Sequence, residues 1–300
     1  MTYLKSGDTI AIAATARHIS EEQLNPAIQL FTSWGLNVVK SNSIFSVSNS
    51  FAGTDEQRIE ALQILLDDEK IKAIFCARGG YGTVRILDKL DFTKFIRNPK
   101  WIVGFSDVTA LFSHIYSNYT VSGIHACMPI TMQGDLKDEA SIESLKKALF
   151  GNEINYTFSA NTLNRNMDVE GILIGGNLSV LCSLMGSKSE MNFDDKILFI
   201  EDVGEYYYHI DRMMQVLKRA EKLKKLRALL VGGMNDMNDN KSPFEFNKTC
   251  YEIISENVSD YNFPVFYGFP AGHEKTNMAI KLGENAKLSV CKNEINFSQH

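Results

Sequence analysis

Ser106 is the residue of this sequence best placed to act as a nucleophile. It follows the apolar run 101–105, and an amphipathic helix is expected after Asp107. A serine on a tight strand-to-helix turn is exposed at the carboxyl end of a sheet, where backbone N–H groups can stabilise an oxyanion. Gly104 supplies the first glycine of the Gly-x-Ser-x-Gly nucleophile motif, but Val108 replaces the second. Alternatively, Ser106 or Asp107 is only the N-cap of the helix, a position that both residue types favour.

An acid and a base that could activate this serine occur in the second half of the chain. Glu201 and Asp202 directly follow the apolar run 197–200, where they could orient a histidine or cap the next helix. His273 lies in a loop rich in glycine and proline, and such loops often carry function. His125, within an expected strand, is interpreted as a core or pocket residue whose ring nitrogens have hydrogen-bond partners. A nucleophile, an orienting acid and a base from two halves of a chain favour a triad in a cleft between domains.

A glycine-rich segment, residues 78–82, also follows an expected strand. Glycine lets the backbone approach a ligand closely or adopt a positive φ. The dinucleotide-binding spacing fails because Arg85 stands where the third glycine belongs, and there is no phosphate-loop lysine. The segment is therefore interpreted either as a tight turn or as a loop that binds an anion or oxyanion.

Strands and helices alternate in the first half of the chain and must position these residues. The expected strands are residues 9–14, 38–40, 71–77, 101–105 and 122–126. Thr54 with Gln57 and Ser20 with Gln23 are capping-box signals for two helices, although Pro26 would lie inside the second of these. Continuous apolar runs are typical of strands covered on both faces, so this half predicts a doubly wound α/β domain.

The second half resumes strand-like segments after a polar stretch. The expected strands are residues 171–174, 196–200, 228–231, 265–267 and 288–290, separated by two or three helices. Between about residues 133 and 168 the composition turns polar, which favours a connection between domains. We expect an N-terminal domain over residues 1–135, a linker over 136–168 and a C-terminal domain over 169–300.

Composition excludes several classes of protein. The 300 residues carry 31 basic and 36 acidic side chains, a net charge of −5 and a pI near 5.7, unlike an electrostatic nucleic-acid binder. The five cysteines include no CxxC pair, and His273-Glu274 opens no HExxH motif because Asn277 stands at its fifth position, so we expect no metal. No apolar run reaches the roughly 20 residues that span a bilayer, so we expect a cytoplasmic protein without membrane contact.

Short motifs along nearly the whole chain resemble the LD-carboxypeptidase family of serine peptidases, which includes the microcin C self-immunity proteins. The motifs are residues 7–10, 51–55 with Arg58, 78–82, 104–109, 175–178, 199–202 with 210–212, and 272–273. Each motif is weak alone, but their shared order is specific. One departure is the segment 13–16, Ala-Ala-Thr-Ala, where the family commonly has a turn like Pro-Ser-Gly.

The resemblance implies a flavodoxin-like doubly wound N-terminal domain and a smaller, β-rich α/β C-terminal domain, usually in a homodimer without cofactor or metal. The family's catalytic triad falls on Ser106, Glu201 and His273. The backbone N–H groups of Gly80 and Asp107 would then form the oxyanion hole. The implied activity removes the terminal D-alanine from murein tetrapeptides during cell-wall recycling.

Two other functions stay open at this point. A self-immunity enzyme would cleave the amide of a peptidyl or aminoacyl nucleotide and would want an aromatic platform, yet Trp34 and Trp101 both fit core positions. A non-catalytic ligand-binding protein would use the glycine-rich segment and the cleft, but all three triad residue types are present. Arg78 and Arg212 are candidates for holding the substrate carboxylate, although Arg212 could instead form a structural ion pair.

Overall fold

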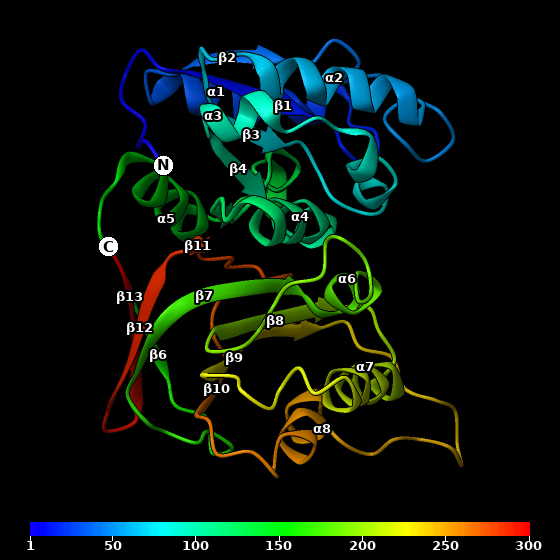
Figure 1. Ribbon diagram of the computed structural model, residues 1–300, viewed down its shortest axis with the longest axis vertical. Helices are drawn as coiled ribbons and strands as arrows, with labels where there is room; N and C mark the ends of the chain where they lie inside the picture. The colour runs from blue at the N-terminus through cyan, green and yellow to red at the C-terminus, as the bar shows by residue number, and fades with distance from the viewer.

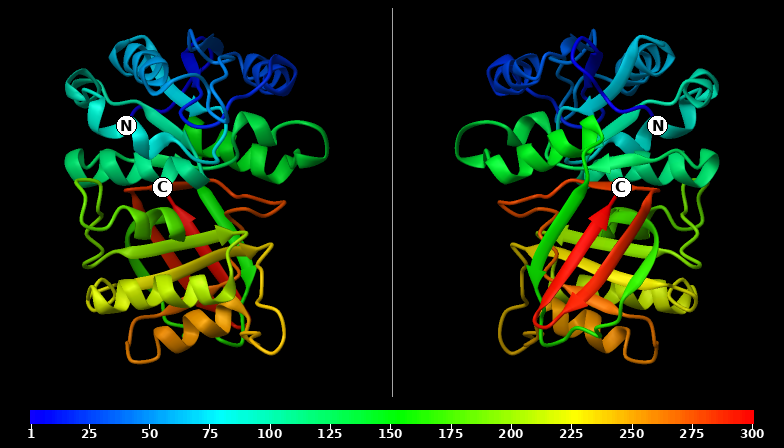
Figure 2. Two further views of the ribbon diagram at one scale, coloured as in Figure 1. Left: turned by 90° about the vertical axis from the view of Figure 1, so that its right-hand side faces the viewer. Right: turned by 90° about the vertical axis from the view of Figure 1, so that its left-hand side faces the viewer.

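The computed structural model describes residues 1–300, which form two β-sheets and their covering helices. In Figure 1 the first half of the chain, blue to green, lies above the second half, green to red. The side views of Figure 2 show the last strands, in red, within the lower half. The chain is therefore an α/β protein with two sheets, as the sequence predicts.

The upper sheet has the strand order of a flavodoxin-like fold. It lies in the order β11-β5-β4-β3-β1-β2, and every pair is parallel except β11 with β5. The order of the first five strands, 2-1-3-4-5, is that of flavodoxin-like sheets and confirms the expected doubly wound fold. Its strands are β1 (Thr9–Ala13), β2 (Asn37–Lys40), β3 (Ile71–Cys76), β4 (Trp101–Gly104), β5 (Gly123–His125) and β11 (Ile280–Leu282).

Helices connect and cover these strands. They are α1 (Glu21–Ser33), α2 (Asp55–Asp67), α3 (Thr93–Arg97), α4 (Thr109–Tyr119) and α5 (Glu139–Phe150). Short 3-10 turns are η1 (Thr83–Arg85), η2 (Leu87–Lys89), η3 (Ser106–Val108), η4 (Pro129–Thr131) and η5 (Gly134–Leu136). Both expected capping boxes form, at Ser20 before α1 and at Thr54 before α2. Pro26 lies inside α1, which continues past it although proline has no N–H to donate.

The lower sheet is mixed. It lies in the order β10-β9-β8-β7-β12-β13-β6, with the first four strands parallel and the last three antiparallel. Its strands are β6 (Ile154–Ser159), β7 (Val169–Asn177), β8 (Ile197–Val203), β9 (Ala228–Asn235), β10 (Val265–Tyr267), β12 (Asn285–Cys291) and β13 (Glu294–Gln299). The helices of this half are α6 (Leu178–Ser183), α7 (Tyr207–Arg219) and α8 (Cys250–Asn257).

Three strands, β6, β11 and β13, and one helix, α5, lie where the sequence analysis expected none. The stretch 136–168, expected to be a linker, contains helix α5 and strand β6. Strand β11 belongs by sequence to the second half but pairs with β5, so the upper sheet contains strands from both halves of the chain. The domain boundaries given above remain a prediction, and the chain crosses between the two sheets after residue 168 as well as before it.

The two halves also share an apolar core. One large cluster of buried side chains extends from the upper sheet to Phe199, Leu230 and Phe297 of the lower sheet. Alternate residues of the same strands, such as Leu198 and Ile200, face a second cluster beneath α7 and α8. Because apolar burial continues across the two sheets, it stabilises their position relative to each other. None of the helices has the length and apolar character needed to cross a membrane.

Candidate active site

Ser106 lies on a tight turn between β4 and α4. Its backbone has a φ of 63°, in the left-handed region that a side chain disfavours. Such backbone strain occurs often at functional sites. Neither η3 nor α4 has a side chain bonded to its N-terminus, and the carboxylate of Asp107 instead accepts the N–H of Thr83 at 2.9 Å. The simpler interpretation, in which Ser106 or Asp107 is only a helix N-cap, is therefore wrong.

The tertiary structure brings Ser106, His273 and Glu201 into one hydrogen-bonded row. The Nε2 atom of His273 lies 3.1 Å from Ser106 Oγ. On the other side of the ring, Nδ1 lies 2.7 Å from Glu201 Oε2, and the backbone N–H of His273 donates to the same oxygen at 3.2 Å. With Nδ1 protonated toward Glu201, Nε2 is the nitrogen free to accept the serine proton.

The positions of the acid and the base are fixed from both halves. Glu201 lies in β8 beside Asn177 of β7 and is fully buried. Asn235, the last residue of β9, donates from Nδ2 to the carbonyl of His273 at 2.8 Å. The ring of Phe105, from the upper half, lies 4.8 Å from that of His273. These contacts hold the imidazole between the two sheets.

Glu201 and His273 shift each other's pKa. Burial acts to raise the pKa of Glu201, but the hydrogen bond and positive charge of His273 outweigh it and lower that pKa below its usual value. Burial likewise acts to lower the pKa of His273, but the hydrogen bond and charge of Glu201 raise it above its usual value. The pair therefore favours an ionised acid and a histidine of increased basicity.

The glycine-rich loop lies against the turn that carries Ser106. A β-carbon on Gly79 would lie 3.1 Å from Ser106 Oγ, so glycine allows the closest approach of this loop to the hydroxyl. Gly80 has a φ of 114°, and its N–H is not a donor in any loop hydrogen bond of the chain. A β-carbon on Gly79 would also lie 3.5 Å from the backbone nitrogen of Asp107, so the loop and the Ser106–Asp107 turn lie side by side, as expected of an oxyanion loop.

A cavity of about 480 Å³ opens beside His273. Carboxylates dominate its charged lining, which comprises Asp135, Asp138, Asp236, Glu274 and Lys275. Burial raises the pKa of Glu274. The cavity has the size of a small-ligand site, and its lining has more acidic than basic side chains.

Sequence models of known families match both halves of the chain. The LD-carboxypeptidase N-terminal domain matches residues 10–126, and the LD-carboxypeptidase C-terminal domain matches residues 170–288. The chain belongs to the LD-carboxypeptidase family. This result confirms the resemblance found in the sequence motifs.

Relatives match the chain over almost its full length. A probable murein peptide carboxypeptidase of Bacillus subtilis is 30% identical, over 96% of this chain and 91% of the relative. The microcin C7 self-immunity protein of Escherichia coli is 26% identical, over 98% of this chain and 94% of the relative. The crystal structure of muramoyltetrapeptide carboxypeptidase from Oxalobacter formigenes superimposes with a TM-score of 0.86 at 27% identity, covering 97% of this chain and 98% of that one.

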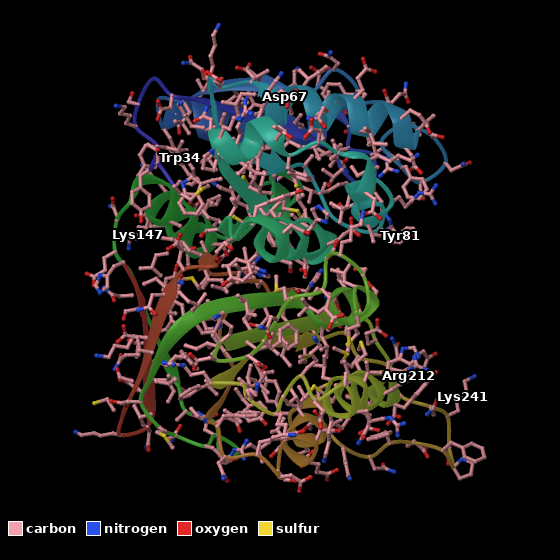
Figure 3. The ribbon with its side chains drawn as sticks, in the orientation of Figure 1. Trp34, Asp67, Tyr81, Lys147, Arg212 and Lys241 are labelled. Atoms are coloured by element: carbon pink, nitrogen blue, oxygen red, sulfur yellow. The ribbon has the colours of Figure 1, made fainter.

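Arg78 and Arg212 are the two candidates for holding the substrate carboxylate, and only Arg78 lies near Ser106. Arg78 directly precedes Gly79, and its Nη1 atom donates to the carbonyl of His18 at 3.1 Å. Arg212 lies on α7 with its guanidinium over the ring of Tyr208, and it does not line the cavity beside His273. Figure 3 shows Arg212 on the lower half, away from Tyr81 of the glycine-rich loop. The arginines that form ion pairs are Arg58, Arg85 and Arg227, so the alternative role of Arg212 in a structural ion pair does not hold either.

His125 is buried near the site, as expected of a core or pocket residue, but without the hydrogen-bond partners that were expected. Its ring is fully buried, 5.8 Å from the ring of Phe105 and 5.0 Å from that of Phe199, and neither ring nitrogen has a hydrogen-bond partner in the protein. Burial lowers its pKa to about 4, although the charge of Glu201 opposes this. The buried imidazole of His125 is therefore neutral at pH 7.

This buried imidazole predicts a pH-dependent stability. Below its usual pKa of 6.5, His125 binds a proton in the unfolded chain but not in the folded one, so the free energy of unfolding should fall between pH 6.5 and 4. The loss from this one group should approach about 3 kcal/mol at pH 4. Urea unfolding between pH 4 and 7 should therefore show a weaker acid loss in His125→Phe than in the wild type. Equal slopes in the two proteins, with exposed His18→Gln as control, would contradict the prediction.

Proposed function

We propose that this chain is a serine-type LD-carboxypeptidase that removes the terminal D-alanine from murein tetrapeptides, in cytoplasmic cell-wall recycling and as a homodimer. The observation that carries the proposal is the hydrogen-bonded row of Ser106, His273 and Glu201 beside a cavity. The row has the geometry of nucleophile, base and orienting acid in serine hydrolases. Its setting in the LD-carboxypeptidase family selects peptides as the substrate class.

In the first half of the reaction, Ser106 Oγ attacks the carbonyl carbon of the peptide bond to D-alanine. His273 Nε2 takes the hydroxyl proton, and Glu201 stabilises the imidazolium that results. The carbonyl oxygen becomes an oxyanion that accepts hydrogen bonds from the N–H groups of Gly80 and Asp107, each worth roughly 3 kcal/mol in other hydrolases. The tetrahedral intermediate then collapses, His273 gives its proton to the leaving amine, and D-alanine departs.

The second half regenerates the enzyme. Water attacks the ester formed between Ser106 and the shortened peptide, and His273 takes a proton from that water. Collapse of the second tetrahedral intermediate breaks the ester, and the proton returns to Ser106. The tripeptide leaves with a new carboxylate at the L-centre of its diamino acid. No step needs a metal or a redox cofactor to balance.

The charged lining of the cavity supports a diamino acid next to the scissile bond. Such a residue carries a free ammonium group on its side chain, and carboxylates within about 4 Å attract it strongly in a partly buried setting. Glu274 and Asp236 line the cavity near His273 and suit this role. The diamino acid belongs to the part of the peptide that stays bound to Ser106 as the acyl group.

The second candidate is hydrolysis of an aminoacyl-nucleotide amide, which the 26% identity to a microcin C7 self-immunity protein favours. A nucleobase needs an aromatic platform to stack on. Trp101 is buried and donates from Nε1 to the carbonyl of Thr2, and Trp34 packs against Phe31 and Phe150. Neither tryptophan is available, so the carboxypeptidase function is preferred.

The proposal predicts release of D-alanine from murein tetrapeptide by the purified protein. Mass spectrometry should detect free D-alanine and the matching tripeptide in equal amounts, with no cleavage of the internal bonds. An aminoacyl-nucleotide amide, incubated in parallel, should remain intact. Cleavage of the nucleotide substrate alone would establish the second candidate instead, and cleavage of neither would refute both.

A further inference from the structure

Two loops meet beside Ser106 at the point where the upper sheet reverses its strand order. The loop after β1 leads to β2 on one side, and the loop after β3 leads to β4 on the other. Open α/β sheets bind ligands in the crevice between two such loops. Buried Arg58 fastens both, since its Nη1 donates to the carbonyl of Thr15 at 2.6 Å and to that of Gly82 at 3.0 Å. The crevice is therefore held in a fixed shape.

Arg17, from the loop after β1, is exposed and lies across this crevice against Gly80. A β-carbon on Gly80 would lie 2.6 Å from Cδ and 2.7 Å from Nε of Arg17. A β-carbon on the preceding Gly79 would lie 3.1 Å from Ser106 Oγ. Two consecutive glycines thus contact Arg17 and Ser106, and consecutive Cα atoms are about 3.8 Å apart. The Arg17 side chain therefore lies against the same loop that borders the nucleophile.

Neither Arg17 nor its neighbour Arg78 has an acidic partner. Ion pairs are formed instead by three other arginines, namely Arg58 and Arg85 with Asp55, and Arg227 with Asp195. The Nε atom of Arg78 is buried without any hydrogen-bond partner, and burial together with the charge of Arg17 lowers the pKa of this arginine. Two adjacent positive charges repel each other, and a buried donor without a partner is costly. An anion bound between them would remove both penalties.

We propose that Arg17 and Arg78 together bind the terminal carboxylate of the peptide substrate and so restrict cleavage to the last peptide bond. The inference rests on the proposed function. A guanidinium pairs with a carboxylate through two parallel hydrogen bonds, which fixes its orientation as well as its charge. A carboxylate held by these arginines, beside the loop that borders Ser106, places the bond nearest the C-terminus at the nucleophile. An internal peptide bond lies too far from the bound terminal carboxylate to reach Ser106.

The test compares a murein tetrapeptide with the same peptide carrying a C-terminal amide. The wild type should cleave the free acid with the higher kcat/KM. Arg17→Gln should raise KM for the acid by about 10- to 100-fold, as expected from losing a charged hydrogen bond. The same variant should leave kinetics with the amide unchanged, and Arg17→Lys should restore part of the preference for the acid. Arg97→Gln, an exposed arginine elsewhere in the same half, is the matched control.

Binding measurements separate this inference from the proposed function. Calorimetric titration of the Ser106→Ala protein should give tighter binding of the acid than of the amide, and Arg17→Gln in that background should abolish the difference. Equal binding of acid and amide, or equal effects of Arg17→Gln on both, would overturn the carboxylate site. Absence of D-alanine release by the wild type, with selective acid binding retained, would instead refute the proposed reaction alone.

Discussion

Replacement of Ser106 by alanine should lower kcat/KM for D-alanine release by about 10⁴-fold or more, because loss of a nucleophile removes the covalent route entirely. The hydroxyl has one defined partner, Nε2 of His273 at 3.1 Å, and lies on a turn whose strained φ presents it to the site. Binding of the tetrapeptide should persist, since the glycine-rich loop and the cavity remain. Release of D-alanine measured by mass spectrometry, alongside calorimetric binding, checks both parts.

Ser259→Ala is the matched control for this variant. Ser259 is exposed and donates only to the nearby carbonyl of Glu256, so its loss should change neither turnover nor binding. A Ser106→Ala protein that keeps wild-type turnover would refute the serine mechanism. A wild type that binds the peptide but never cleaves it would support a non-catalytic ligand-binding protein.

Replacement of Glu201 by glutamine should lower kcat/KM by roughly 10³- to 10⁴-fold and move its acid limb to lower pH. The carboxylate oxygen Oε2 accepts two hydrogen bonds from His273 and so fixes the ring with Nε2 toward Ser106. An amide nitrogen at this place would favour the opposite tautomer, whose Nε2 carries a hydrogen and cannot accept the serine proton. The rate constant should fall far more than the affinity for substrate.

The direction of the pH shift follows from the base. His273 must be neutral to accept a proton, and Glu201 raises its pKa above the usual value of 6.5. In the wild type, kcat/KM should therefore fall as the pH drops through a value above 6.5. Without the charge of Glu201 the pKa of His273 decreases, so the residual activity of the variant should persist to lower pH.

A second Glu–His pair provides the control for this experiment. Glu205 Oε2 lies 2.5 Å from Nδ1 of His209, at the start of α7 and outside the cavity. Glu205→Gln should leave both the rate and the pH profile of D-alanine release unchanged. If Glu201→Gln behaved like Glu205→Gln, Glu201 would have no part in catalysis.

Local patterns predicted most regular elements, because their causes lie within a few residues. The capping boxes at Ser20 and Thr54 form since each needs only a side chain and a backbone group three residues apart. Strand β6 escaped prediction although its residues alternate between buried and exposed, because its outward side chains gave the stretch a polar average. Strand β11 has only three residues, and its pairing with β5 depends on contacts more than 150 residues apart along the chain.

The sequence by itself determined the α/β class, the family and the three residue types of the triad. Apolar runs select strands by local burial, and the order of the motifs along the chain carries the family. Only the tertiary structure decided which groups meet. It brought His273 and Glu201 from the lower sheet to Ser106 at the end of β4, and it left Arg212 on the outer helix α7. It also placed Arg17 across Gly80, a contact that requires the loops after β1 and β3 to converge. Distances between residues remote in sequence follow from packing of the whole chain, and no local pattern encodes them.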